Sequence, residues 1–264
     1  MALKFSANLN FLFTENVKCI SERIRFAHKS GFQAVEIPYP DEELLEVVKA
    51  IKDTKVIVSL INIKIDKTRD DLKFGSASII GEEKLFQKQL NETISFANAV
   101  DCKKIHLMAG VTDTKTELEN LHIYTSNLRK ASDLLRTYDI MGVIEPINKY
   151  AIPTYFMNSF EKASKVLTEI NSPNLKLLVD LYHLQHISGN VTKTLEEKKN
   201  LIGHFQIAQA PNRNEPDTLG ELNYSYVFQK LEDFGYDDWI GCEYKPKTST
   251  IEGLDWISKF NYSL

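Results

Sequence analysis

Oxygen-bearing side chains stand at or near the ends of four predicted strands in the second half of the chain. They are Glu145, Asp180, Gln206 and Glu243. Three carboxylates and one amide would form an oxygen-rich ligand set, which suits a hard divalent cation. Buried carboxylates without a cation or other partners would be costly. If the four strands lie side by side, the sequence predicts a metal site.

Each of these residues also has an ordinary structural interpretation. Glu145 could simply end a strand, Asp180 could be a helix N-cap, and Gln206 could be a polar strand residue. Glu243 is harder to explain in this way, because strand alternation points its side chain opposite to Cys242 and presents an acid on the inward face. The four residues fall on consecutive predicted strands, which favours a shared function.

The elements that must position these residues are short apolar runs alternating with amphipathic segments. Eight runs are predicted as strands: Lys4–Asn8, Ala34–Pro38, Val56–Asn62, Lys104–Met108, Ile140–Pro146, Leu175–Asp180, Ile202–Ala208 and Trp239–Tyr244. The segments between them are predicted as helices: Cys19–Lys29, Glu42–Lys52, Glu83–Val100, Thr116–Tyr138, Ser159–Ile170, Thr192–Lys199, Tyr224–Phe234 and Thr250–Phe260. Capping residues support several helix starts, among them Asp41, Thr116 and either Asn158 or Ser159, and Gly31 is a stop.

Strand and helix alternation with short connections predicts an α/β fold with parallel strands. Eight repeats in 264 residues match a closed (β/α)8 TIM barrel, with an open doubly wound sheet as the rival. We expect one domain over residues 1–264, because no linker or change in composition interrupts the chain. Two long irregular connections, Lys64–Gly81 and Pro211–Asn223, both follow strands and would lie over the face where barrel active sites form.

Composition narrows the class of ligand. The formal charge of −4 argues against nucleic acid or an anionic membrane as a partner and leaves a small polar substrate. The three cysteines, Cys19, Cys102 and Cys242, are too far apart for a thiolate metal site and suggest a reducing compartment. The N-terminal residues lack a signal-peptide pattern, so we expect a cytoplasmic protein.

Beyond these patterns, six stretches resemble the hydroxypyruvate isomerase family, which belongs to the xylose-isomerase-like TIM barrels together with the ketose 3-epimerases. They are Phe5–Leu9, Gly31–Glu36, Ile144–Asn148, Asp180–Gln185, Ile202–Ala208 and Gly241–Pro246. The resemblance implies a xylose-isomerase-like TIM barrel. It also implies an intramolecular oxidoreductase that converts hydroxypyruvate to 2-hydroxy-3-oxopropanoate (tartronate semialdehyde) through an enediolate.

The resemblance also implies functions for single residues. Those at the family's metal positions are Glu145, Asp180, Gln206 and Glu243. Glu145 and Glu243 match the pair that moves the proton, while His183 and Arg213 fall near positions that hold substrate oxygens. His106, at the end of the fourth predicted strand, could line the wall of the site or be a core histidine.

The charges of the predicted cage set a further requirement. A divalent cation with three ionised carboxylates has a net charge of about −1. A substrate that carries a carboxylate therefore needs a positively charged side chain nearby. Arg213 is the first candidate because a guanidinium binds carboxylates in a planar fork. The further candidates are Lys64, Lys67, Arg69 and Lys245. The oxygen ligands favour magnesium or manganese over zinc.

Departures from the family pattern leave the substrate open. In the loop after the seventh predicted strand the family's acid is replaced by Gln209 and its histidine by Asn212. Two glycines are replaced by Asn214 and Asp217, and Leu219 looks inserted. The stretch from Ile61 onward also lacks the family's Asn-Leu-Pro and glycine-rich pattern.

Several functions other than hydroxypyruvate isomerase therefore remain open. A 2-oxo-tetronate isomerase, a ketose 3-epimerase and a non-catalytic barrel with altered loops are all consistent with the sequence. A barrel nuclease would need more than the six histidines present and a basic groove. A homo-oligomer is left open, since Tyr224, Tyr226 and Phe228 could meet a partner subunit or belong to the core.

Overall fold

The computed structural model describes residues 2–15 and 17–264. Its strands run parallel in one closed barrel, in the order β1 to β8. Their bounds are β1 Lys4–Asn8, β2 Ala34–Ile37, β3 Ile57–Asn62, β4 Lys104–His106, β5 Met141–Ile144, β6 Leu175–Asp180, β7 Ile202–Ile207 and β8 Trp239–Cys242. The predicted TIM barrel is confirmed, and the open doubly wound sheet is excluded.

Helices follow the strands as the periodicity predicts. Their bounds are α1 Ile20–Lys29, α2 Leu44–Thr54, α3 Glu83–Ala99, α4 Glu117–Arg136, α5 Phe160–Ile170, α6 Leu181–Ile187, α7 Val191–Lys198, α8 Tyr224–Asp233, α9 Thr250–Gly253 and α10 Trp256–Lys259. Two differences stand out. The last predicted helix is divided into α9 and α10, and α6, which begins directly after β6, was not predicted.

The predicted helix ends are confirmed in part. Ser159 caps α5, because its hydroxyl accepts a hydrogen bond from the Lys162 N–H, and Gly31 has the positive φ of +100° expected after α1. Asp41 instead begins a short 3-10 turn ahead of α2, and Thr116 makes no side-chain capping bond. Among the described residues, no helix is both long and apolar enough to cross a bilayer.

The chain forms two compact units. The first comprises residues 1–59, 180–199 and 204–264, and the second comprises residues 60–179 and 200–203. The expectation of one domain over the whole chain stays a prediction.

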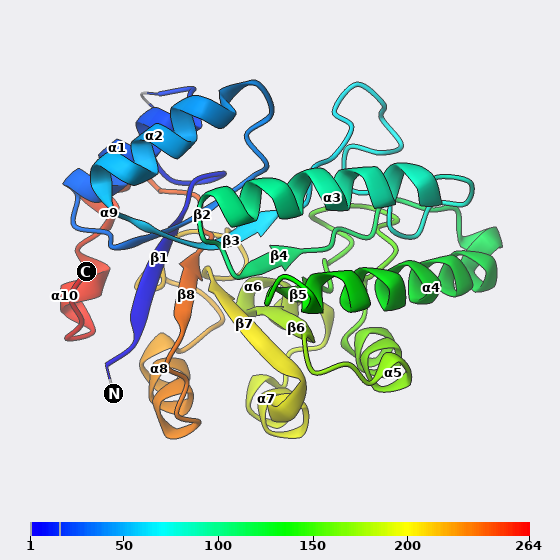
Figure 1. Cartoon of the computed structure of the whole chain (residues 1–264). Coiled ribbons are helices and arrows are strands. Elements are labelled where there is room, and N and C mark those ends of the chain that lie inside the picture. The colour runs from blue at the N-terminus through cyan, green and yellow to red at the C-terminus, as the bar shows by residue number, and fades with distance from the viewer. Residues whose placement is uncertain (1, 16) are drawn as a thin grey trace. The chain divides into compact units, whose positions relative to one another are not determined.

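In the first unit, β1 pairs with both β2 and β8, and β8 pairs with β7. α1 and α2 lie side by side (Figure 1). The ring of Phe5 meets those of Phe228 and Trp256 edge to face in a buried aromatic core. Tyr224 and Phe228 therefore belong to the core, while Tyr226 is exposed.

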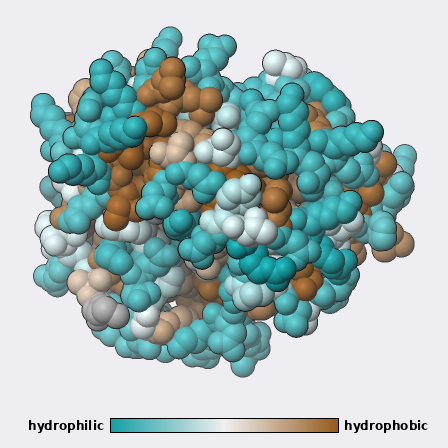
Figure 2. Space-filling view, in the orientation of Figure 1, coloured by the Kyte–Doolittle hydropathy of each residue, from teal (hydrophilic) through white to brown (hydrophobic). Residues whose placement is uncertain are grey.

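The surface over this pair of helices is mixed. Figure 2 shows hydrophobic side chains among the hydrophilic ones where α1 and α2 lie, and Phe26 and Leu45 are the exposed large apolar residues of these two helices.

In the second unit, β3, β4, β5 and β6 pair in sequence, with Ile144 of β5 opposite Leu177 of β6. α3 and α4 lie side by side (Figure 1). The long connection after β3 is irregular, as predicted. It passes so close to the 104–109 segment that a Cβ at Gly75 would lie 2.2 Å from the Met108 carbonyl oxygen, and only glycine fits there.

Candidate active site

Asp180 ends β6 and begins α6, and each of its carboxylate oxygens has its own partner. Oδ1 accepts a hydrogen bond of 2.9 Å from the Tyr182 N–H, which caps the helix. Oδ2 accepts one of 3.0 Å from Arg213 Nη2. The side chain of His183 lies against the same carboxylate, with Nε2 3.6 Å from Oδ2. The capping and charged-site interpretations of Asp180 are therefore compatible.

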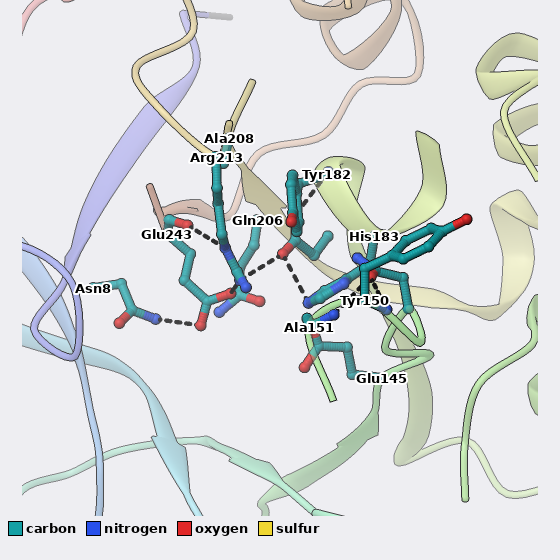
Figure 3. Close-up of polar contacts among 12 residues, drawn as sticks. Asn8, Glu145, Tyr150, Ala151, Tyr182, His183, Gln206, Ala208, Arg213 and Glu243 are labelled. Carbon is teal, nitrogen blue, oxygen red and sulfur yellow. Dashed lines mark hydrogen bonds and ion pairs between the residues drawn. The ribbon is translucent and has the colours of Figure 1, made fainter. Parts of the chain in front are cut away.

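Glu243 follows β8 and faces the same guanidinium. Arg213 Nη2 donates a short hydrogen bond to Glu243 Oε2 (Figure 3) as well as the one to Asp180, so a single cation bridges the two acids. The other oxygen, Oε1, accepts from Asn8 Nδ2 at 3.1 Å. The guanidinium is also packed against the rings of Phe11 and Tyr182, at 4.6 and 4.8 Å from their centroids.

Burial dominates the electrostatics of these acids. Loss of solvent raises the pKa of Glu243 to about 8, with the neighbouring Asp180 and Glu36 adding to the rise and Arg213 opposing it. Burial also raises the pKa of Asp180, again against the effect of Arg213. One arginine thus compensates only part of the charge, and the site favours additional positive charge.

Gln206, on β7, has one end of its amide engaged and the other unpaired. Its Nε2 donates to Glu36 Oε2 at 2.8 Å. Its Oε1 is buried and has no hydrogen-bond partner among the described residues. A buried unpaired acceptor is costly, and a metal ligand is one way to satisfy it. The residues present therefore fit a hard divalent cation.

Sequence reasoning missed the residues behind Gln206 and Glu243. Glu36 is buried on β2, where it bonds to Asn8, His204 and Gln206. A signal was present, since Glu36 is an acid within the otherwise apolar strand Ala34–Ile37.

The second unit holds the remaining predicted residues. Glu145, just past β5, lies with Oε2 3.6 Å from Nε2 of His106 at the end of β4, and both side chains are buried. Lys64 pairs instead with Glu92, a residue of α3, at 2.5 Å. The structure thus brings Glu145 and His106 together but directs the ammonium of Lys64 to a residue outside the predicted set.

The loop after β7 explains one departure from the family pattern. Gln209 Nε2 donates to the Leu222 carbonyl at 2.9 Å, and its Oε1 accepts from the N–H groups of Ala210 and Leu222. An amide can close the loop in both directions, whereas a carboxylate could only accept. The inserted Leu219 is almost fully exposed.

Comparisons with known proteins agree with this fold. The model of the xylose isomerase-like TIM barrel family matches residues 24–260. A Drosophila melanogaster protein named "Putative hydroxypyruvate isomerase" is 60% identical over the full length of both chains. Hydroxypyruvate isomerase of Escherichia coli is 36% identical, covering 98% of this chain and 99% of its own. The crystal structure of a Brucella melitensis protein described as an AP endonuclease of family 2 is 33% identical and superimposes with a TM-score of 0.92, covering 97% of this chain and 98% of that one.

The chain therefore belongs to the xylose isomerase-like TIM barrel family. Within that family the resemblance to hydroxypyruvate isomerases is confirmed, and the prediction of an isomerase is confirmed with it. Such enzymes act on small molecules, which agrees with the expected class of substrate.

Proposed function

We propose that this isomerase interconverts hydroxypyruvate and 2-hydroxy-3-oxopropanoate and that it depends on a divalent cation. The observation that carries the proposal is the buried Oε1 of Gln206, which has no hydrogen-bond partner within residues 2–15 and 17–264, in the unit where Arg213 bridges Asp180 and Glu243. These groups are oxygen donors that need positive charge. The relatives named hydroxypyruvate isomerase support the choice of substrate.

The residues proposed to hold the cation are Glu145, Asp180, Gln206 and Glu243. Strand register supports the inclusion of Glu145. Ile144, the last residue of β5, pairs with Leu177 of β6. Glu145 follows Ile144 directly, and Asp180 is the third residue after Leu177, at the end of β6. Both acids thus belong to the carboxyl ends of adjacent strands, where active sites of this fold form.

An all-oxygen ligand set favours magnesium or manganese over zinc. When bound, such a cation would act as a Lewis acid and stabilise the negative charge that develops on the substrate oxygens. Arg213, which bridges the two acids of the first unit, would then be available to bind the substrate carboxylate. We assign this task to Arg213 and not to Lys64, whose ammonium pairs with Glu92.

Proton transfer is assigned to the two glutamates. One removes a proton from the hydroxyl-bearing carbon C3 of hydroxypyruvate, which yields an enediolate. The proton of the C3 hydroxyl then passes to the oxygen on C2, and the other glutamate returns a proton to C2, which leaves the aldehyde at C3. The raised pKa of Glu243 suits a group that accepts and returns a proton near neutral pH. His183 would donate a hydrogen bond to a reacting oxygen, and His106, beside Glu145, would line the wall.

The test is deuterium exchange into hydroxypyruvate in D2O with added Mn2+, followed by NMR, together with detection of the aldehyde product. We expect exchange and isomerisation by the parent protein, and a loss of about 100-fold or more in isomerisation by Glu243→Gln. Glu15→Gln is the control, because the hydrogen bonds that Glu15 accepts from Thr250 involve none of the residues proposed for the site. Full isomerase activity in Glu243→Gln, or no metal dependence, would refute the proposal.

Three further arms separate the alternatives. A four-carbon 2-oxo acid tests a 2-oxo-tetronate isomerase, and a ketose panel scored for 3-epimers tests an epimerase. A duplex with an abasic site tests the nuclease, for which the negative net charge is unfavourable. Turnover of one of these substrates without action on hydroxypyruvate would replace the proposed reaction, and inactivity on all of them would favour the non-catalytic barrel.

A further inference from the structure

We propose that Glu36 is a positioning residue that fixes the amide of Gln206 with its oxygen toward the cation site. This inference rests on the proposed function, because it concerns the way in which a proposed metal ligand is oriented. Glu36 touches neither substrate nor metal in this proposal. It acts through Gln206 directly and through Asn8 on Glu243.

The hydrogen bonds of Glu36 define its position. Its Oε1 lies 2.6 Å from His204 Nε2, and its Oε2 accepts from Gln206 Nε2 at 2.8 Å and from Asn8 Nδ2 at 2.9 Å. Glu36 is about 1% exposed, so water does not compete for these bonds. Three polar side chains from β1 and β7 thus converge on one carboxylate of β2.

This arrangement determines which end of the Gln206 amide faces away. An ionised carboxylate can only accept hydrogen bonds, so it selects the NH2 end of the amide. The oxygen must then point in the other direction, and this is the atom that lacks a partner among the described residues. With the amide rotated by half a turn the NH2 group would face the site, and an amide nitrogen that carries two hydrogens is no ligand for a hard cation.

Asn8 extends the same control to Glu243. Its Oδ1 accepts from the Asn10 N–H at 3.0 Å, which fixes the orientation of its own amide. Its Nδ2 therefore donates to both Glu36 Oε2 and Glu243 Oε1, at 2.9 and 3.1 Å (Figure 3 shows the bond to Glu243). Glu36 is thus connected to two of the proposed ligands.

Strand β8 leaves space for this carboxylate. Gly241 of β8 pairs with Gln206 of β7, and a Cβ at Gly241 would lie 2.2 Å from Glu36 Oε1. Any larger residue would displace the carboxylate. A buried acid that served only to fill space would be inferior to an apolar side chain of similar size, because its desolvation is costly. The space beside Gly241 is therefore best explained by the hydrogen bonds of Glu36.

The experiment measures the affinity of the metal-free protein for Mn2+ by calorimetry, without substrate. Outer hydrogen-bond partners of metal ligands typically change affinity by 10- to 100-fold. We expect a loss of about that size in Glu36→Leu, which removes the acceptor. Glu36→Gln should lose less, because its amide oxygen can still accept from Gln206 while its nitrogen faces His204.

A double variant separates orientation from simple structural support. Glu36→Leu combined with Gln206→Glu places an oxygen at both ends of the ligand side chain, so orientation no longer matters. We expect this pair of changes to recover Mn2+ affinity to within about tenfold of the parent. Gln89→Leu is the control for loss of a buried polar group, because Gln89 is buried on α3 and bonds to Ser76. It should lower the thermal midpoint without changing Mn2+ affinity.

The outcomes are distinct. Parent-like Mn2+ affinity in a folded Glu36→Leu protein, or a double variant no better than the single one, overturns the role of Glu36 and leaves the proposed function intact. A parent protein that binds no Mn2+ or Mg2+ overturns both proposals together.

Discussion

The buried acids of the two units lie beside different basic side chains. In the first unit, Asp180 and Glu243 share the guanidinium of Arg213, a cation that keeps its charge at every accessible pH. In the second, Glu145 lies 3.6 Å from His106, which carries a charge only when it is protonated. The first unit thus supplies permanent positive charge to its acids, whereas the acid of the second unit lies beside a side chain that is positive only when protonated.

The largest expected effect comes from removing the acid of the second unit. Glu145→Gln keeps the shape of the side chain but cannot accept the substrate proton, and we expect the turnover number to fall by about 100- to 10,000-fold. Deuterium incorporation by the remaining base, Glu243, should persist at one carbon of the substrate. NMR of the exchanged substrate measures both quantities. Equal loss of exchange at both carbons would contradict separate tasks for the two glutamates.

The next effect tests the permanent cation of the first unit. Arg213→Gln removes the cation beside Asp180 and Glu243, which remain buried, and we expect the metal-free protein to lose about 3 kcal/mol of unfolding free energy. Saturating Mn2+ should recover part of that loss, because the metal supplies the missing charge. Urea unfolding with and without Mn2+ measures the difference. An equal loss in both conditions would argue against a metal beside these acids.

A smaller effect follows from the pKa of Glu243. In the folded protein Glu243 keeps its proton up to about pH 8, whereas in the unfolded chain its pKa is the ordinary 4.5. Between these two pH values unfolding releases the proton, so the free energy of unfolding falls as pH rises. The slope is at most about 1.4 kcal/mol per pH unit for this group. Cation binding needs the ionised form and should release about one proton at about pH 6. Calorimetry of Mn2+ binding in two buffers of different ionisation enthalpy measures the number of protons released. A number near zero would contradict the expectation.

Much of the fold follows from local patterns in the sequence. Each predicted strand is present, because buried parallel strands are continuous apolar runs that stand out between amphipathic helices. The helix α6 was missed, since Leu181–Ile187 has only seven residues, too few for a helical period to stand out. The local sequence pattern also gives no reason to divide the predicted helix Thr250–Phe260 into α9 and α10.

The site could be predicted only in part, for a physical reason. Asp180, Gln206 and Glu243 lie at strand ends, and the geometry of a parallel barrel gathers strand ends, so sequence alone could nominate them. The partners of Glu36 come from positions 28 and about 170 residues away and depend on side-chain direction. No local pattern encodes such a network. The same holds for Lys64, whose pairing with Glu92 depends on the packing of α3.

The smallest effect is expected at an exposed arginine, which contrasts with the largely buried Arg213. Arg69, on the long loop after β3, bonds to Asp71 and Glu82, and all three side chains are partly or largely exposed. Exposed ion pairs contribute little because solvent and salt screen them, so Arg69→Gln should change the unfolding free energy by less than about 1 kcal/mol. The same urea titrations that follow Arg213→Gln measure it. A loss as large as that of Arg213→Gln would show that burial does not distinguish the two arginines, and the contrast between a buried permanent cation and an ordinary surface one would fail.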